Sequence, residues 1–181
     1  MSTVIIKKSK RKLCENTDNP TKIYGVYMKS ILERKVFLNI TEIGKTVKNN
    51  LELKLEKMLG GKCVNEGYIK PKTIKIHKYS SGIVNNNVVE FYVTFDAMVC
   101  LPVECMLIEC ICKTITKAGI HGEVIDDEKN VPITMFIARD HHHLDSVFSE
   151  IKENDKITAR VIGIRYELED NFICTIGKLV Q

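Results

Sequence analysis

The sequence predicts an α+β protein made of two units, a small mixed unit followed by a β-barrel. Three observations predict this class. Residues 41–59 carry the clearest helical hydrophobic repeat, residues 89–97 alternate apolar and polar side chains, and a series of short apolar segments follows Pro102. The chain has 181 residues, which suffices for one ordinary domain or two small ones.

The first 21 residues are expected to form a disordered tail. A basic run at residues 7–12 is followed by several turn-forming residues, and few apolar side chains are available for a core. Two interpretations of the basic run stay open: nuclear localisation or phosphate contact on one side, and a solvated tail on the other. The charge follows a short apolar stretch, and this order argues against a secretory signal.

Residues 22–100 are predicted to form the first unit. Two short strands at residues 23–28 and 36–40 precede a helix, which Thr41 is placed to cap and which Gly60-Gly61 ends. The apolar side chains that recur every four residues on one helix face are Ile43, Val47, Leu51, Leu55 and Leu59.

Two further strands complete this unit. The first covers residues 74–77, and the second covers residues 89–97 with a period of two. The apolar side chains on one face of the second strand are Val89, Phe91, Val93, Phe95 and Ala97. A helix flanked by antiparallel strands gives a small α+β unit.

Residues 101–181 are predicted to form the barrel. The expected strands are residues 106–114, 120–125, 133–138, 156–164 and 172–176, and a short helix at residues 144–151 falls between the third and fourth. Five strands with a helix in that position is the plan of an OB fold, and each connection carries turn-forming residues.

An OB barrel points to single-stranded nucleic acid, because such barrels bind oligonucleotides across their second and third strands and the adjoining loops. Basic side chains there can follow a phosphate backbone while an aromatic ring stacks on a base. The predicted RNA-binding residues are Lys113, Lys117, His121, Phe136, Arg139, His141, Arg160, Arg165 and Tyr166. The alternative is a barrel whose aromatic rings face the core. Phe136 points opposite to its apolar neighbours, so it is either exposed or packed beneath the helix.

Charge is distributed unevenly between the two units. Residues 1–100 carry 18 Lys/Arg against 9 Asp/Glu, and residues 101–181 carry 9 against 14, which together give the net charge of +4. The basic half suits phosphates or an acidic partner surface. The acidic barrel half predicts modest RNA affinity with a steep salt dependence.

The histidines and cysteines do not form a recognisable metal motif. Neighbouring histidines such as His141-His142-His143 cannot all converge on one ion, and Cys105, Cys110 and Cys112 lack the spacing of a structural zinc site. Seven cysteines, an odd number, argue against a fully paired disulfide framework. We expect core cysteines and a surface histidine loop, and no metal.

Catalytic motifs are also missing from the sequence. It has no Gly-x-Ser-x-Gly, no phosphate-binding glycine loop ending in Lys-Ser/Thr and no His-Glu-x-x-His. The expectation is a protein that is not an enzyme by itself, with no catalytic residues and no cofactor.

Short motifs recur in a fixed order over residues 23–180. Those of the first unit are Gly61-Lys62-Cys63, Glu66-Gly67-Tyr68-Ile69, Ser81-Gly82-Ile83 and Val93-Thr94-Phe95-Asp96-Ala97. Those of the barrel are Ile115-Thr116-Lys117-Ala118-Gly119-Ile120, Met135-Phe136-Ile137 and Val161-Ile162-Gly163-Ile164-Arg165. In the order and spacing of these motifs the chain resembles the stalk subunit of archaeal and eukaryotic RNA polymerases, the seventh-subunit family of RNA polymerase II.

The resemblance implies a non-catalytic subunit of a DNA-directed RNA polymerase. Its first unit, the tip, would dock on the polymerase core, and its barrel would contact nascent single-stranded RNA. The implied partners are polymerase core subunits and a small helical stalk subunit. The implied docking residues, in a loop expected to be exposed, are Glu66, Gly67, Tyr68, Ile69, Lys70 and Pro71.

The chain also departs from that family pattern. The basic N-terminal extension precedes the usual start, and the triple histidine is not part of the pattern. Its Lys/Asn/Ile-rich composition is similar to that of large DNA viruses, so the expected location is the nucleus, or a viral factory or virion for a viral protein. The rival hypothesis is a free-standing OB-fold RNA-binding protein that acts in translation or RNA decay.

Overall fold

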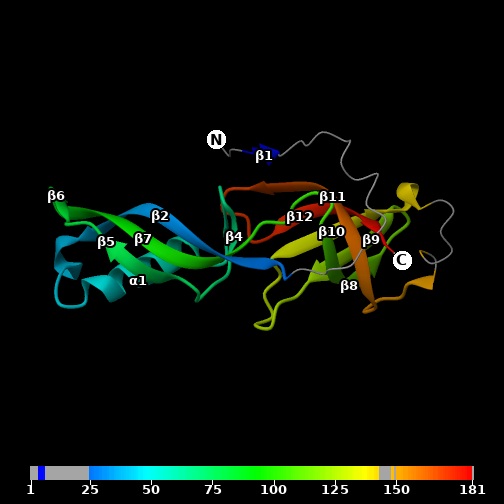
Figure 1. The fold of residues 1–181 in the computed structure, drawn as a ribbon, viewed down its shortest axis with the longest axis horizontal. Helices are drawn as coiled ribbons and strands as arrows, with labels where there is room; N and C mark the ends of the chain where they lie inside the picture. Colours follow the sequence, from blue (N-terminus) through cyan, green and yellow to red (C-terminus); the bar gives the residue numbers. More distant parts are fainter. Residues whose placement is uncertain (1–3, 7–24, 143–147, 149, 181) are drawn as a thin grey trace.

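The protein has an α+β fold in which two six-stranded sheets and one α-helix make up the regular structure of the described residues (Figure 1). The structure is a computed structural model, and it describes residues 4–6, 25–142, 148 and 150–180. In this part of the chain no helix has both the length and the apolar content that a membrane span requires.

The tip is an open sheet with a helix on one face. Its elements are β2 (Tyr27–Asn39), the 3-10 turn η1 (Ile40–Glu42), α1 (Val47–Leu59), β3 (Cys63–Val64), β4 (Gly67–Ile69), β5 (Lys75–Tyr79), β6 (Ile83–Asn85) and β7 (Val88–Cys100). Strands β2 and β7 pair along their whole lengths, and β4, β5 and β6 also pair with β7. The predicted apolar stripes meet here: Leu51, Leu55 and Leu59 of α1 are buried, as are the alternating residues 89–97 of β7.

Two details of the tip differ from the sequence prediction. The expected strands at residues 23–28 and 36–40 are parts of one element over the described residues, because β7 supplies a backbone partner for every residue of β2, including the polar segment between them. The helix begins at Val47 and not after Thr41, which lies in η1. Gly44 lies between η1 and α1, and glycine disfavours a continuous helix through this position. Ile43 therefore stays 39% exposed.

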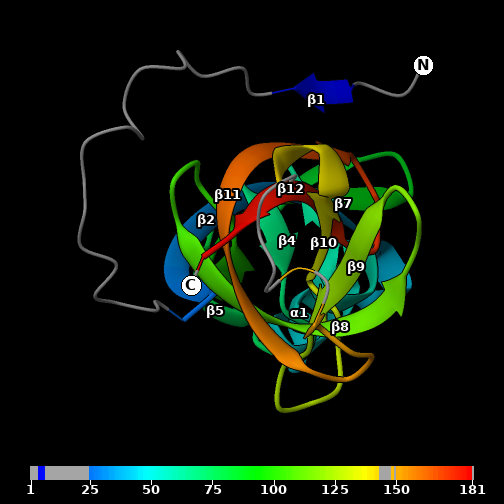
Figure 2. The ribbon, with the colours of Figure 1, turned by 90° about the vertical axis from the view of Figure 1, so that its right-hand side faces the viewer.

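The barrel contains all five expected strands. Its elements are β8 (Leu107–Ile115), β9 (Gly119–Val124), β10 (Ile133–Ala138), the 3-10 turn η2 (Arg139–His141), β11 (Lys156–Glu167) and β12 (Ile173–Leu179). Neighbouring strands follow the order β8-β9-β10-β12-β11, and β11 pairs with β8 to close the ring (Figure 2). Strands β10 and β12 run parallel and the other neighbours antiparallel. The expected helix at residues 144–151 lies mostly outside the described residues.

A short N-terminal strand, β1 (Val4–Ile6), pairs antiparallel with the end of β11. These three residues fall in the segment expected to be a disordered tail, so the structure differs from that expectation at this point. The rest of that segment, including the basic run, lies outside the described residues.

The tip and the barrel share one apolar core at their junction. Cys63, Tyr68 and Cys100 of the tip pack in the same buried cluster as the barrel residues. Backbone hydrogen bonds join β3 to the β11–β12 loop, since the Cys63 amide donates to the Asp170 carbonyl at 2.7 Å and the Glu169 amide to the Cys63 carbonyl at 2.9 Å. The two units are therefore packed and hydrogen-bonded together.

Candidate nucleic-acid interface

Three outward-facing side chains form a row across the middle strands of the barrel. His121 on β9 is the cross-strand neighbour of Phe136 on β10, and Phe136 is the neighbour of Ile176 on β12. The His121 and Phe136 rings lie 4.8 Å apart between centroids. Phe136 is half-buried and Ile176 is 49% exposed. We call these three residues the outer row. The open alternative for Phe136 is thus decided, because its ring lies on the outer surface beside His121.

Basic side chains lie on one side of the outer row, toward the end of the barrel away from the tip. Lys178 follows Ile176 on the same face of β12 and is the cross-strand neighbour of Arg160 on β11. Lys117 lies in the β8–β9 turn and Arg139 in η2, and the Arg139 amide donates to the Ala118 carbonyl at 3.0 Å. We call Lys117, Arg139, Arg160 and Lys178 the basic end. Proteins that bind single-stranded nucleic acid combine aromatic side chains, on which bases stack, with cations that follow the backbone.

The structure thus brings together His121, Phe136, Lys117, Arg139 and Arg160 from the predicted set. Sequence reasoning missed Ile176 and Lys178. The signal that could have found them is the alternation of β12, in which residues 174, 176 and 178 are exposed and residues 173, 175 and 177 are buried.

Three other predicted residues occupy different surroundings. Lys113 is exposed at a bulge between β8 and β9. His141 is exposed in η2, adjacent to the basic end. Arg165 lies on the opposite side of the outer row, where it is the neighbour of Cys174 and lies 3.7 Å from the Glu167 carboxylate.

Base stacking by Tyr166 was a wrong prediction. Its side chain is only 2% exposed, and its hydroxyl donates a hydrogen bond of 3.2 Å to the Asn65 carbonyl in the tip. Burial raises the pKa of this phenol, with smaller effects from Cys63 and Glu66. Tyr166 is therefore a junction residue, because its hydroxyl bonds the tip from the end of β11.

The histidine run is also partly buried. His142 is 4% exposed; its Nδ1 lies 2.9 Å from the Ala138 carbonyl, and its Nε2 accepts the Leu179 amide at 2.9 Å. The imidazole is therefore neutral with its proton on Nδ1. Its ring also stacks on Phe148 at 5.2 Å. Hence His142 ties the end of β10 to the end of β12, whereas the sequence predicted a surface loop; His143 lies outside the described residues.

Four cysteines behave as small core residues, as the sequence predicted. Cys63, Cys100, Cys110 and Cys112 are buried with free thiols. Burial raises the pKa of each, to about 12 for the first three. Cys174 is free and exposed. Over the residues that the structure describes, no group of His, Cys, Asp and Glu has the arrangement of a metal site.

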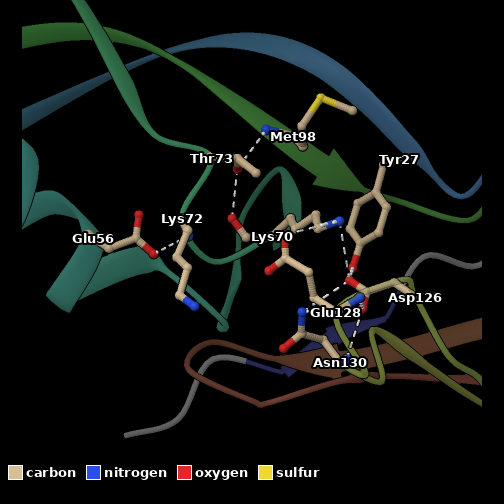
Figure 3. A network of polar contacts seen from close by, with 9 residues as sticks. All are labelled: Tyr27, Glu56, Lys70, Lys72, Thr73, Met98, Asp126, Glu128 and Asn130. Carbon is tan, nitrogen blue, oxygen red and sulfur yellow. Dashed lines mark hydrogen bonds and ion pairs between the residues drawn. The ribbon is translucent and has the colours of Figure 1, made fainter.

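The segment predicted to dock on the polymerase core lies at the junction. Lys70 sits 3.6 Å from the Asp126 carboxylate and 3.8 Å from that of Glu128, with its ammonium 5.3 Å from the Tyr27 ring centroid (Figure 3). The Tyr27 hydroxyl donates to Asp126 at 3.0 Å, and Asn130 donates to the same carboxylate. Burial alone would raise the pKa of Asp126, but the hydrogen bonds led by those from Asn130 lower it. Lys70 therefore holds the tip to the β9–β10 loop.

The neighbouring residues are not an exposed loop, so that expectation was wrong. Gly67, Tyr68 and Ile69 form β4 and are all buried. Gly67 has φ +131°, and a Cβ on it would lie 2.4 Å from the Cys100 carbonyl oxygen, so this close strand contact requires glycine. Glu66 pairs with Arg34 of β2. Pro71 is partly buried.

Comparison with known proteins provides one distant relative. The chain is 26% identical over 175 residues to a protein of Acanthamoeba polyphaga mimivirus named "Putative DNA-directed RNA polymerase subunit". The alignment covers 87% of this chain and 83% of the viral protein. No family model matches the sequence.

Proposed function

We propose that this chain is a non-catalytic subunit of a DNA-directed RNA polymerase, of the stalk type. The observation that carries the proposal is the similarity to the mimivirus protein. The aligned region covers 87% of this chain, so it includes both the tip and the barrel. The fold supports it, because a tip with one helix is joined to a barrel with OB strand order. The proposed location is the nucleus, or a viral factory or virion for a viral protein.

The distal end of the tip is the docking surface that we favour. Strand β6, the turn η1 and the last residues of β2 lie at the end of the tip farthest from the barrel (Figure 1), and five exposed apolar side chains belong to these elements or directly follow η1. This distal apolar surface consists of Phe37, Ile40, Ile43, Ile83 and Val84. Clusters of exposed apolar side chains are typical of protein-binding surfaces. The originally predicted residues 66–71 are occupied by contacts within the chain.

The small helical partner is proposed to cover the open face of the tip sheet, opposite α1. This face exposes Ile31 and Tyr92, at 68% and 44%. It also carries polar pairs, since the Lys29 ammonium and the His77 ring each lie 2.8 Å from the Asp96 carboxylate. The hydrogen bond from Lys29, with a smaller one from His77, lowers the pKa of Asp96 although desolvation opposes the shift. An amphipathic helix could meet this mixture of apolar and charged groups.

Nascent RNA is proposed to cross the outer row and the basic end. Phe136 and His121 would stack on bases while the four cations of the basic end follow the phosphates. Glu123 on the other side of the row would disfavour phosphate there.

Affinity purification of the tagged full chain from its native cells tests the polymerase assignment. Large polymerase subunits should co-purify in near-equal amounts, and the double substitution Ile83→Glu with Val84→Glu should abolish their recovery. Leu53→Glu is the matched control, because Leu53 is 69% exposed on the outer face of α1. Recovery of RNA without polymerase subunits would instead favour the free-standing RNA-binding protein.

Fluorescence anisotropy with a labelled single-stranded RNA tests the RNA surface. Phe136→Ala should weaken binding roughly 5- to 150-fold, the equivalent of one stacked base. Tyr92→Ala is the control, since this exposed ring lies on the tip. Arg160→Ala with Lys178→Ala should lower the salt dependence of binding. Equal affinities for the Phe136 and Tyr92 variants would place the RNA elsewhere.

A further inference from the structure

Strand β11 extends beyond its partner in the barrel wall. Residues Lys156–Arg160 pair with β8, and the Val161 backbone still exchanges hydrogen bonds with Cys105 and Met106. Beyond that point β11 continues to Glu167 while pairing with β12 on its other side as far as Arg165. Among the described barrel residues, no strand pairs with this part of the edge that faced β8. Unpaired strand edges are ready templates for another extended chain.

The chain's own N-terminus occupies part of this edge. Val4, Ile5 and Ile6 pair with Glu167, Tyr166 and Arg165 in antiparallel register. Figures 1 and 2 show β1 outside the ring, next to β11. Within the described residues, no strand covers Ile162–Ile164 on the same edge. The strand is therefore short, β-branched and located outside the closed barrel, and its removal would leave the ring intact.

We propose that the β11 edge at Arg165–Glu167 is a strand-addition site, closed in cis by Val4–Ile6, that accepts an extended segment of a protein partner. The occupant in cis defines the partner's chemistry: at least three consecutive residues free of proline, with β-branched side chains, in antiparallel orientation. Main-chain hydrogen bonds supply the affinity in such pairing. A partner segment that also covers Ile162–Ile164 would pair with more of the edge than β1 does.

Replacement of β1 by a partner strand would take place next to the contact between tip and barrel. Tyr166 contacts Asn65 of the tip, and Glu169 and Asp170 bond Cys63. A strand added at Arg165–Glu167 thus lies beside the junction of tip and barrel. Its binding would release Val4–Ile6 from β11.

The cis strand competes through proximity. About twenty residues separate β1 from β2, and a covalent connection of that length gives the cis strand an effective concentration in roughly the millimolar range. A partner segment with a longer pairing region can exceed that, whereas an isolated copy of the N-terminal strand cannot. The site should therefore bind poorly in the full chain and better once β1 is removed.

Amide hydrogen exchange of the full chain tests the cis pairing. Ile5→Pro removes a backbone donor and disfavours strand pairing. Ile5→Val keeps the backbone donor and a β-branched side chain, so it is the matched control. Residues 161–168 should exchange several-fold faster in Ile5→Pro and after deletion of residues 1–6, and should be unchanged in Ile5→Val. Equal exchange in all four proteins would overturn the proposal.

Addition in trans is tested with a synthetic peptide of residues 2–8 and the deletion variant. At millimolar concentration the peptide should restore the protection of residues 161–168, and the same peptide with Ile5→Pro should not. A failure of the first peptide to restore protection would overturn the strand-addition site. Dimerisation of the deletion variant with restored protection would overturn the protein partner in favour of a second copy.

Discussion

Removing the carboxylate of Asp126 should loosen the junction between tip and barrel. Its side chain is only 5% exposed and lies close to the Lys70 ammonium. Its carboxylate accepts hydrogen bonds from the Tyr27 hydroxyl and from the backbone amides of Glu128 and Asn130, the last two at 2.9 and 2.8 Å. Truncation to alanine leaves these donors without their acceptor and one cation without its nearest partner. We expect Asp126→Ala to cost about 3–5 kcal/mol of unfolding free energy, as loss of one member of a buried ion pair does.

The expected loss of unfolding free energy is large enough to measure by thermal denaturation. For a chain of this length about 1 kcal/mol corresponds to about 2–4 °C, so the variant should melt roughly 6–20 °C below wild type in a calorimetric or circular-dichroism scan. Asp127→Ala is the matched control, since Asp127 is an exposed aspartate next in sequence. Its unfolding free energy should change by no more than about 0.5 kcal/mol. Indistinguishable melting of the two variants would refute the role assigned to this network.

The pH dependence gives the same prediction a second readout. Because the folded-state pKa of Asp126 is lowered, its ionised form contributes stability at pH 7, and this contribution is lost as pH falls below about 3.9 and through the folded-state pKa. Asp126→Asn should therefore be less stable than wild type at pH 7, by about 1.5–3 kcal/mol. The difference should shrink in acid. A difference that is constant from pH 7 to pH 3 would contradict the charge-based explanation.

Two further predictions concern the cores of the tip and the barrel. Leu55→Ala should cost about 2–5 kcal/mol in urea denaturation because Leu55 is fully buried, whereas Leu53→Ala on the exposed face of the same helix should cost little; equal costs would refute the helix orientation. His142→Ala should cost about 2–4 kcal/mol, because two hydrogen bonds and the Phe148 stack are lost, and the exposed His141 offers the control. A wild-type urea midpoint for His142→Ala would show that the imidazole does not hold β10 to β12.

The fold class could be predicted from the sequence because the helical and the strand repeats of apolar residues are both regular. The four-residue repeat through Leu51, Leu55 and Leu59 and the two-residue repeat of β7 each identify a buried face without knowledge of the partner. The five barrel strands follow from short apolar segments and their turns. One of them, Ile133–Ala138, has the predicted bounds because Pro132 precedes it and Arg139 opens a turn after it.

The site could be predicted only in part, since sequence patterns give a residue's face but not its neighbours. Alternation placed Phe136 opposite the core side chains, and the structure adds His121 beside it. No local signal shows that Tyr166 meets Asn65 or that Lys70 meets Asp126, because these contacts join residues 101 and 56 positions apart.

The sequence by itself determined the helix α1, the long strand β7 and the five barrel strands, because local periodicity and turn chemistry act over a few residues. Only the tertiary structure decided which side chains are free to meet a partner. Gly67, Tyr68 and Ile69 look like a polar-flanked loop in sequence, yet β7 and the barrel enclose them. Burial depends on what packs against a segment from elsewhere in the chain, and that information is not local.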